Sequence, residues 1–318
     1  MHSAWPTKYL SVACACALIS CGQDDSNQRS GAGTNLPEAG STVPGLHRDG
    51  NQLTLQTDQF TLQPGQEKYM CWTAKASEAV KVASFSKDAQ PFVHHVVLVT
   101  TTEDEPDGMR ECDGLFRLKW RPLFAAGAGK VELAFPDDVV SAIDQNTQLL
   151  VQLHLLNQSD QPVTDSAAIV MKLSDAPVTE NVMIGAFGNT DISLPPGQPG
   201  QVVVDCQNPI GTRLVGFFPH MHMLGRAMTF ELGPTPDDMH MVYERTPYEF
   251  GDQRIDSTDM MLDGNSQVRV TCNYENTTQQ AVTYGESTHD EMCWLVMFLV
   301  GRPTGCVLGS GPIFGDGG

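Results

Sequence analysis

Most of the chain consists of short runs in which apolar and polar residues alternate, the pattern of β-strands with one buried face. Clusters of Gly, Pro, Asn and Asp separate these runs, as turns do. No stretch has a long, well-capped helical period, although residues 139–144 are compatible with a turn or two of helix. The pattern predicts an all-β protein built of antiparallel β-sandwiches. Strands are expected at residues 52–62, 92–101, 148–156, 168–173, 202–206, 213–218, 227–232, 267–274 and 292–300.

Two segments of the chain share the same order of features. Residues 57–66 and 190–198 both contain Pro-Gly-Gln, and each is followed by a cysteine and then by a pair of histidines. Such a repeat favours two related domains, although the turn chemistry of Pro-Gly-Gln alone would also produce some similarity. The joint falls at the polar, proline-containing stretch 174–177. We expect two tandem jelly-roll-like sandwiches at residues 50–176 and 177–308, followed by a tail at 309–318.

The N-terminus has the features of an export signal. An apolar run from Leu10 to Ile19 is too short to span a bilayer, so residues 1–20 are predicted to be a secretory signal peptide. Leu18-Ile19-Ser20-Cys21 resembles a bacterial lipobox, in which Cys21 becomes the lipid-modified N-terminus; an ordinary signal peptide cut nearby is the alternative. Residues 21–49 are expected to form a flexible tether. The expected location is the bacterial cell envelope, periplasmic or outer-surface, with a lipid anchor in the membrane.

Composition and charge narrow the class of protein. The chain has 318 residues and is 41% hydrophobic, enough for globular cores, and its formal net charge of −19 argues against nucleic acid as a partner. Of the nine cysteines, Cys14 and Cys16 leave with the signal peptide and Cys21 would carry lipid, so six remain. An even number of cysteines in an oxidising compartment predicts three disulfides, with fifteen pairings open.

Candidate chemistry centres on His220 and His222, one residue apart in an apolar setting. On a strand, side chains two positions apart leave the same face, so the two imidazoles would project together and supply half of a transition-metal site. The alternative is that one or both are hydrogen-bonded core histidines.

The first half of the chain offers a second set of histidines. His94 and His95 are adjacent, so both reach one metal only where a bulge or twist interrupts the strand; otherwise one is a ligand and the other packs. His154 lies in an apolar strand and would complete a site of three nitrogens.

Met292 is the candidate third ligand beside His220 and His222. It precedes Cys293 in Asp290-Glu291-Met292-Cys293, so on a strand its thioether faces away from the thiol. A soft thioether beside two imidazoles favours copper over zinc or magnesium.

Together these motifs resemble the copper type II, ascorbate-dependent monooxygenases, the family of peptidylglycine α-hydroxylating monooxygenase and dopamine β-monooxygenase. The similarity extends from about residue 53 to residue 306. The motifs that carry it occur in the family's order: Val93-His94-His95, Gln152-Leu153-His154, His220-Met221-His222-Met223-Leu224-Gly225-Arg226 and Asp290-Glu291-Met292-Cys293.

The resemblance implies two copper ions per chain, on two sandwiches that face each other across an open cleft. His94, His95 and His154 match the site that stores and transfers an electron. His220, His222 and Met292 match the site that binds dioxygen and hydroxylates the substrate, with ascorbate as the one-electron donor. The resemblance also pairs Cys71 with Cys112, Cys206 with Cys306 and Cys272 with Cys293.

Departures from the family pattern concern the substrate. Peptidylglycine enzymes bind their substrate's carboxylate with an arginine before the H-x-H motif and a tyrosine after the methionine ligand, where this chain has Phe218 and Val296. A site without a cation binds a carboxylate poorly, so we expect an apolar or aromatic small molecule. Gln152 matches a position that would orient His154, or it is a plain polar strand residue. Tyr69 matches a tyrosine that lines the cleft, or it simply packs.

The sequence thus predicts an exported copper-dependent monooxygenase that hydroxylates a C–H bond of a small organic substrate with dioxygen and a reductant such as ascorbate. One alternative is a copper-binding or copper-handling lipoprotein of the same fold without catalysis. Another is an adhesion or carbohydrate-binding β-sandwich with structural metals, for which tight zinc or calcium would be the sign.

Overall fold

The computed structural model describes residues 43–310, apart from 89, 114–116, 118, 178–179, 208–210, 265 and 302–304. In this part of the chain every regular element is a β-strand, so the all-β prediction is confirmed. The described residues include no helix that is long and apolar enough to cross a membrane. The predicted signal peptide, Cys21 and most of the predicted tether lie outside the described residues.

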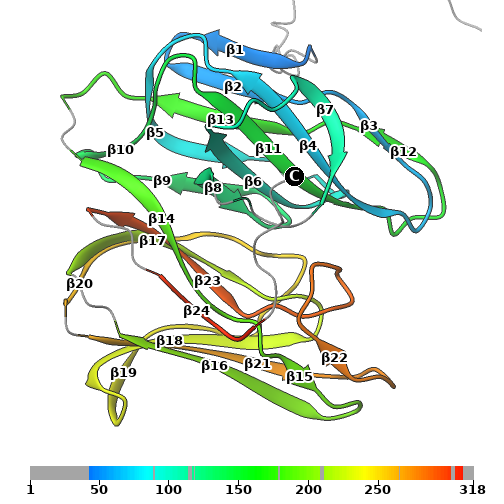
Figure 1. Cartoon of the computed structure of the whole chain (residues 1–318), viewed down its shortest axis with the longest axis vertical. Helices are drawn as coiled ribbons and strands as arrows, with labels where there is room; N and C mark the ends of the chain where they lie inside the picture. The colour runs from blue at the N-terminus through cyan, green and yellow to red at the C-terminus, as the bar shows by residue number, and fades with distance from the viewer. Residues whose placement is uncertain are drawn as a thin grey trace, which may run out of the picture. The chain divides into compact units, whose positions relative to one another are not determined.

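The first half of the chain forms two layers of strands (Figure 1). One layer is a five-stranded sheet with the order β7 (Gly108–Cys112), β4 (Glu67–Lys75), β11 (Gln148–Leu156), β6 (Val93–Thr101) and β8 (Trp120–Ala126). The other is the first part of a longer sheet, with the order β1 (Gly45–Asp49), β2 (Gln52–Gln56), β13 (Ala168–Leu173), β5 (Val80–Lys87) and β10 (Val139–Ile143); β9 (Val131–Ala134) pairs with β5. A small sheet pairs β3 (Phe60–Leu62) with β12 (Val163–Asp165).

The second half repeats the two-layer plan. The longer sheet continues through β14 (Glu180–Asn189), β23 (Trp294–Val300), β17 (Thr212–His220) and β20 (Asp256–Leu262), and β24 (Cys306–Leu308) pairs with β14. Opposite it lies a four-stranded sheet of β16 (Pro199–Gln207), β21 (Gln267–Glu275), β18 (Gly225–Thr235) and β19 (Asp238–Arg245). β15 (Ser193–Leu194) pairs with β22 (Val282–Thr283).

The two halves share one sheet, because β10 of the first half pairs in parallel with β14 of the second. Val139 lies opposite Glu180, and Asn181 Oδ1 accepts a hydrogen bond from the Ala142 backbone nitrogen at 2.8 Å. The short helix allowed at 139–144 is therefore wrong: pairing with strands on both sides decides this β-branched segment. The described residues fall in one compact unit, and the division into domains at 50–176 and 177–308 stays a prediction.

Strands β17 and β23 are buried on both faces, which explains why their sequences are apolar without alternation. Along β23, Leu295, Met297 and Leu299 pack into the core of the second half. The intervening Phe298 and Val300 pack into the core of the first half. The joint between the halves is thus a hydrophobic interior, and side chains on this face of β17 and β23 are directed toward the first half.

Residues 45–49 correct the predicted extent of the tether, 21–49. They form β1 and pair with β2 through a turn at Gly50, whose φ of 56° suits glycine. Leu46 packs against the core, so burial of this apolar residue extends the fold into the predicted tether.

The faint internal repeat has a counterpart in the structure. Gly65 and Gly197, the glycines of the two Pro-Gly-Gln turns, have nearly the same left-handed φ, 70° and 66°. Asn157 and Asn276 are both fully buried, and each side chain accepts from the backbone N–H two residues on and donates to the carbonyl four residues on. The same turn therefore closes the corresponding corner in each half.

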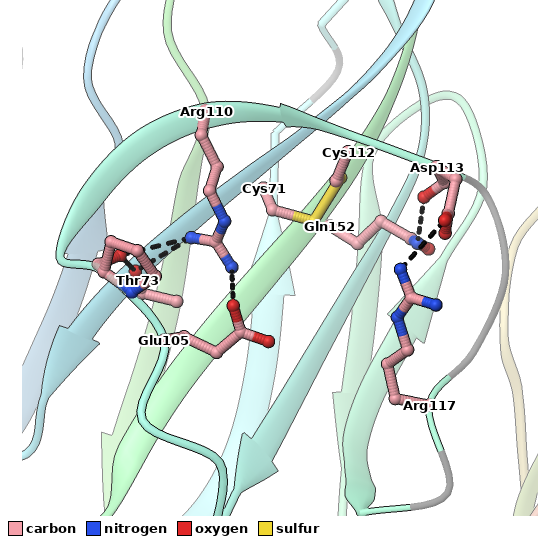
Figure 2. Close-up of a disulfide and its surroundings, with 9 residues drawn as sticks. Cys71, Thr73, Glu105, Arg110, Cys112, Asp113, Arg117 and Gln152 are labelled. Carbon is pink, nitrogen blue, oxygen red and sulfur yellow. Dashed lines mark hydrogen bonds and ion pairs between the residues drawn. A yellow bond between two sulfur atoms is a disulfide. The ribbon is translucent and has the colours of Figure 1, made fainter. Parts of the chain in front are cut away.

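Three disulfides connect the strands, and they are the pairings that the resemblance implies. Cys71–Cys112 joins β4 to β7 (Figure 2). Cys206–Cys306 joins β16 to β24, and Cys272–Cys293 joins β21 to the residue before β23. The last bridge anchors Cys293, the residue that follows Met292.

Candidate metal centre

Three histidines of the first half converge on neighbouring strands. His154 on β11 pairs with His95 on β6, and the next pair is Leu155 with Val93, which leaves His94 as an extra residue in a β-bulge. The bulge turns both adjacent histidines toward His154. One ring nitrogen from each of the three lies within 4.8 Å of the others. Of the two alternatives for His94 and His95, the structure therefore has the bulge.

Glu67 orients His154, a contact that the sequence analysis missed. Its Oε1 lies 2.7 Å from His154 Nε2, and the ring of Tyr69 stacks on the same imidazole with centroids 4.3 Å apart. Donation by Nε2–H to the carboxylate leaves Nδ1 as the nitrogen with a lone pair. That Nδ1 lies 3.3 Å from Nδ1 of His94. Its only sign in the sequence is an acidic residue at the start of a strand, and this feature is too common to identify a residue that orients a histidine.

The His220–His222 pair is built differently from the prediction. Strand β17 ends at His220, and His222 lies in the turn that follows. The hydroxyl of Tyr248 accepts from the backbone nitrogen of Met221 at 2.9 Å and donates to its carbonyl at 2.8 Å, which holds the residue between the histidines. The two rings then lie 5.2 Å apart between centroids.

Glu291 fixes the turn from the other side. Its carboxylate accepts hydrogen bonds from the backbone nitrogens of His222 at 3.0 Å and Leu224 at 2.6 Å. Burial raises the pKa of Glu291 to about 7, while these backbone donors lower it. Because Glu291 precedes Met292, one side chain connects the histidine turn to the segment that carries the thioether.

The histidines of both halves form one cluster of five. Ring centroids of His95 and His220 lie 5.7 Å apart, and those of His94 and His222 lie 6.1 Å apart. The two sets of histidines are therefore not separated by an open cleft in this structure, and the division into two copper sites stays a prediction. The halves meet directly: Tyr69 donates to the carbonyl of Glu286 at 2.9 Å.

Gln253 joins the two sets of histidines. Its Oε1 lies 2.7 Å from His220 Nδ1 and its Nε2 lies 3.4 Å from His94 Nε2. Gln253 is fully buried, and it comes this close because Gly127 has no side chain: a Cβ there would lie 2.2 Å from the Gln253 Cβ. No motif in the sequence marked this glutamine.

Burial keeps four of the five histidines neutral. Burial lowers the pKa of His94 to about 2, of His222 to about 3 and of His220 to about 4, and it holds the pKa of His95 well below its usual range. Neutral imidazoles are the form that binds transition metals.

Two ring nitrogens have the surroundings of metal ligands. His95 Nδ1 and His222 Nε2 are buried, and neither has a hydrogen-bond partner among the described residues. A buried polar atom without a partner costs free energy unless something binds it. The other nitrogen of His222, Nδ1, is 3.1 Å from the carbonyl of Asp290, which orients the ring. Each half thus contributes one open nitrogen, and both fit a metal ion.

A largely apolar cavity of about 260 Å³, called here the apolar cavity, adjoins the cluster. His95, His220 and Met292 are among its lining residues. Most of the remaining surface is hydrophobic, with Pro122, Ile184, Phe218, Trp294, Val296 and Val307. Phe218 and Val296 are direct partners on β17 and β23, so the two predicted substrate positions lie side by side.

Gln152 lines this cavity and does not orient His154. Its Nε2 donates to the backbone carbonyl of Asp113 at 3.0 Å, beside the Cys71–Cys112 disulfide (Figure 2). Its Oε1 is buried without a partner among the described residues. The orienting role expected for Gln152 belongs to Glu67. Tyr69 packs on His154, the simpler of its two alternatives, and is not among the residues that line the apolar cavity.

Buried imidazoles with a thioether beside the same apolar cavity are donors that favour copper. Residues 192–301 match the family model of the copper type II ascorbate-dependent monooxygenase, C-terminal domain. This match agrees with the resemblance seen in the sequence.

Other comparisons add little. No curated protein matches the chain. The major capsid protein P2 from bacteriophage PM2 is 13% identical, with 79% of this chain and 97% of that chain covered and a TM-score of 0.30. PBCV-1 VP54, fitted into a reconstruction of the virophage Sputnik, is 9% identical, with 82% and 96% covered and a TM-score of 0.29. TM-scores this low support no inference about this chain.

Proposed function

We propose that the chain is an exported copper-dependent monooxygenase that hydroxylates a C–H bond of a small organic substrate, with dioxygen and a one-electron reductant such as ascorbate. His94, His95 and His154 would hold the copper ion that stores an electron. His220, His222 and Met292 would hold the ion that binds dioxygen. Copper at these positions would supply single-electron transfer and oxygen activation.

The observation that carries the proposal is the pair of open buried nitrogens, His95 Nδ1 and His222 Nε2. Storage of metal would not require two different donor sets, one of three imidazoles and one with a thioether. Nor would it require an apolar cavity beside the thioether, which a hydroxylase needs to bind its substrate.

The chain's own residues would hold the reacting groups in place. Glu67 and Gln253 orient His154 and His220, and Glu291 fixes the turn that carries His222. The hydrophobic lining of the apolar cavity excludes water from the reacting carbon. Phe218 and Val296 favour an uncharged apolar or aromatic substrate, because a carboxylate would lose its hydration there without gaining a cation.

Export and lipid attachment at Cys21 belong to the same proposal and rest on the N-terminal sequence alone. An oxidising compartment agrees with the three disulfides. Mass spectrometry of the mature protein would detect a diacylglycerol-modified Cys21. An unmodified N-terminus would contradict the lipid anchor and leave the copper chemistry untouched.

The decisive experiment combines metal analysis with oxygen consumption. Mature protein should bind two copper ions and consume oxygen in the presence of reductant and an aromatic substrate with a benzylic carbon. Met292→Ala should lose hydroxylation while the three-histidine site keeps its copper, detected by electron paramagnetic resonance. Copper binding with no turnover of any substrate would favour a copper-handling protein. Tight zinc or calcium with no copper would contradict both.

A further inference from the structure

A second cavity, called here the His94 cavity, adjoins the histidine cluster. It has a volume of about 420 Å³, compared with about 260 Å³ for the apolar cavity. The two cavities share no lining residue: the apolar cavity includes His95, His220 and Met292, whereas the second includes His94. A molecule in one would therefore meet different histidines from a molecule in the other.

The lining of the His94 cavity is more polar. It includes Gln90, Gln158 and Ser159, together with the glycines at 129 and 251. Phe250 also lines it and stacks on the His94 ring, with centroids 4.1 Å apart and planes 26° apart. An aromatic ring packed against an imidazole gives a dense contact between the cavity wall and the three-histidine site.

A buried cation lies behind this wall. Lys87 is almost fully buried, and its ammonium donates to the carbonyl of Gly129, a lining residue, at 2.9 Å. The ammonium is close enough to His94 to contribute to the lowering of its pKa, after burial and the neighbouring histidines. The nearby Asp88 carboxylate lies 3.9 Å from the ammonium of Lys130, which offsets its charge. Lys87, Asp88 and Lys130 together thus carry a formal charge of +1.

This charge matters because the whole chain carries a formal charge of −19. A small anion is repelled by such a molecule unless a local cation compensates. Neither cavity has a lysine or arginine in its lining, but the apolar cavity includes the acidic Glu286, whereas the His94 cavity has no acidic lining residue and has the Lys87 ammonium behind Gly129. The cavity beside Lys87 is therefore the better place for an anionic ligand.

We propose that the His94 cavity is the binding site of the reductant, a small anionic ene-diol of the ascorbate class, and that the apolar cavity is reserved for the organic substrate. The inference rests on the proposed function. Each reductant molecule gives up one electron and one proton and leaves as its radical anion. A cupric ion held by His94, His95 and His154 would accept the electron and become cuprous, and the proton would pass to solvent.

Gly251→Trp tests the site with little risk to the fold. Gly251 lines the His94 cavity, its φ is outside the left-handed region, and a Cβ there meets nothing within 4 Å. The matched variant is Val307→Trp, because Val307 lines the apolar cavity and is 39% exposed. Both variants should bind copper as the wild-type protein does.

The first measurement is anaerobic reduction of the copper-loaded protein by ascorbate, followed by loss of the cupric resonance signal. We expect Gly251→Trp to raise the ascorbate concentration for half-maximal rate at least about tenfold, which corresponds to about 1.4 kcal/mol. Val307→Trp should leave it unchanged and instead raise the KM for the organic substrate. Unchanged reduction in Gly251→Trp, or impaired reduction in Val307→Trp, would overturn the proposal.

The second measurement needs no metal. Equilibrium dialysis of ascorbate against metal-free protein under argon should show binding that Gly251→Trp removes and that Lys87→Met weakens. Reduction by neutral hydroquinone should be unaffected by Lys87→Met. If Lys87→Met slowed reduction by ascorbate and by hydroquinone equally, the proposed role of the Lys87 charge would be refuted. If the wild-type protein binds no copper, the proposed function fails, while the dialysis result still decides whether an anion occupies this cavity.

Discussion

Glu67→Gln tests how the two halves hold the histidine cluster. The Glu67 carboxylate accepts from His154 Nε2 at 2.7 Å and from the backbone nitrogen of Thr288 at 2.9 Å, so it connects the three-histidine site to the segment before Met292. Gln keeps the shape of the side chain but removes its charge and replaces one acceptor oxygen with an NH₂ donor. We expect both the stability and the copper affinity to fall.

The magnitude follows from the surroundings of the carboxylate. Burial raises the pKa of Glu67, but hydrogen bonds from His154 and Thr288 outweigh it and hold the pKa at about 2. Relative to the ordinary value of 4.5, this corresponds to about 3 kcal/mol before solvent screening of the 22% exposed side chain, and to about 1.5–2 kcal/mol after it. Loss of a group that orients a ligand histidine also weakens metal binding about 10–100-fold.

The assay is urea unfolding of metal-free protein, combined with chelator competition for copper. Because the pKa of Glu67 is lowered by folding, its stabilisation is complete above pH 4.5 and disappears as the pH falls through about 2. The difference between wild type and Glu67→Gln should therefore be constant from pH 6 to 8 and shrink in acid. Glu111→Gln, at an exposed position of β7, is the matched control.

Two results would refute this reasoning. One is a free energy of unfolding within about 0.5 kcal/mol of the wild type at pH 7, since surface substitutions without a special role have effects of this size. The other is an unchanged copper affinity, which would mean that His154 is oriented without Glu67.

Three further outcomes are expected. Gly127→Ala should destabilise the protein by about 1–3 kcal/mol in thermal unfolding, because its Cβ would overlap Gln253, whereas Gly251→Ala should be neutral; equal effects would contradict the packing argument. Phe218→Arg should weaken binding of an uncharged aromatic probe to the apolar cavity at least about tenfold in equilibrium dialysis, and unchanged binding would place the substrate elsewhere. Since burial lowers the pKa of His220 to about 4, this residue alone should account for about 2–3 kcal/mol of the stability that metal-free protein loses as the pH falls from 6.5 to 4, so the loss should be smaller by that amount in His220→Gln; a loss of the same size in the variant would refute it.

Several elements of the fold were readable from local pattern alone. Alternation of apolar and polar residues identified strands such as β16 and β21, because each has a period of two that no helix shares. Residues 139–144 were ambiguous for the opposite reason: a five-residue buried strand has no periodicity of its own, and pairing with β5 and β14 decides it.

The site was partly readable for a chemical reason. His94, His95 and His154 were identified as a set from residue type, and the structure places their nitrogens within 4.8 Å. The proposed copper ligands His220, His222 and Met292 came from spacing and resemblance. Glu67, Gln253 and Glu291 were missed because glutamate and glutamine are common on protein surfaces, and only burial beside an imidazole or a backbone amide makes them unusual.

By itself the sequence determined the strands, the histidine and cysteine motifs and the apolar character of the Phe218–Val296 pair. These depend on residue type and on neighbours in the chain. Only the tertiary structure decided that one sheet joins both halves through β10 and β14 and that the five histidines form one cluster. Contacts between residues more than a hundred positions apart, such as Glu67 with Thr288, arise from packing, and no local pattern encodes them.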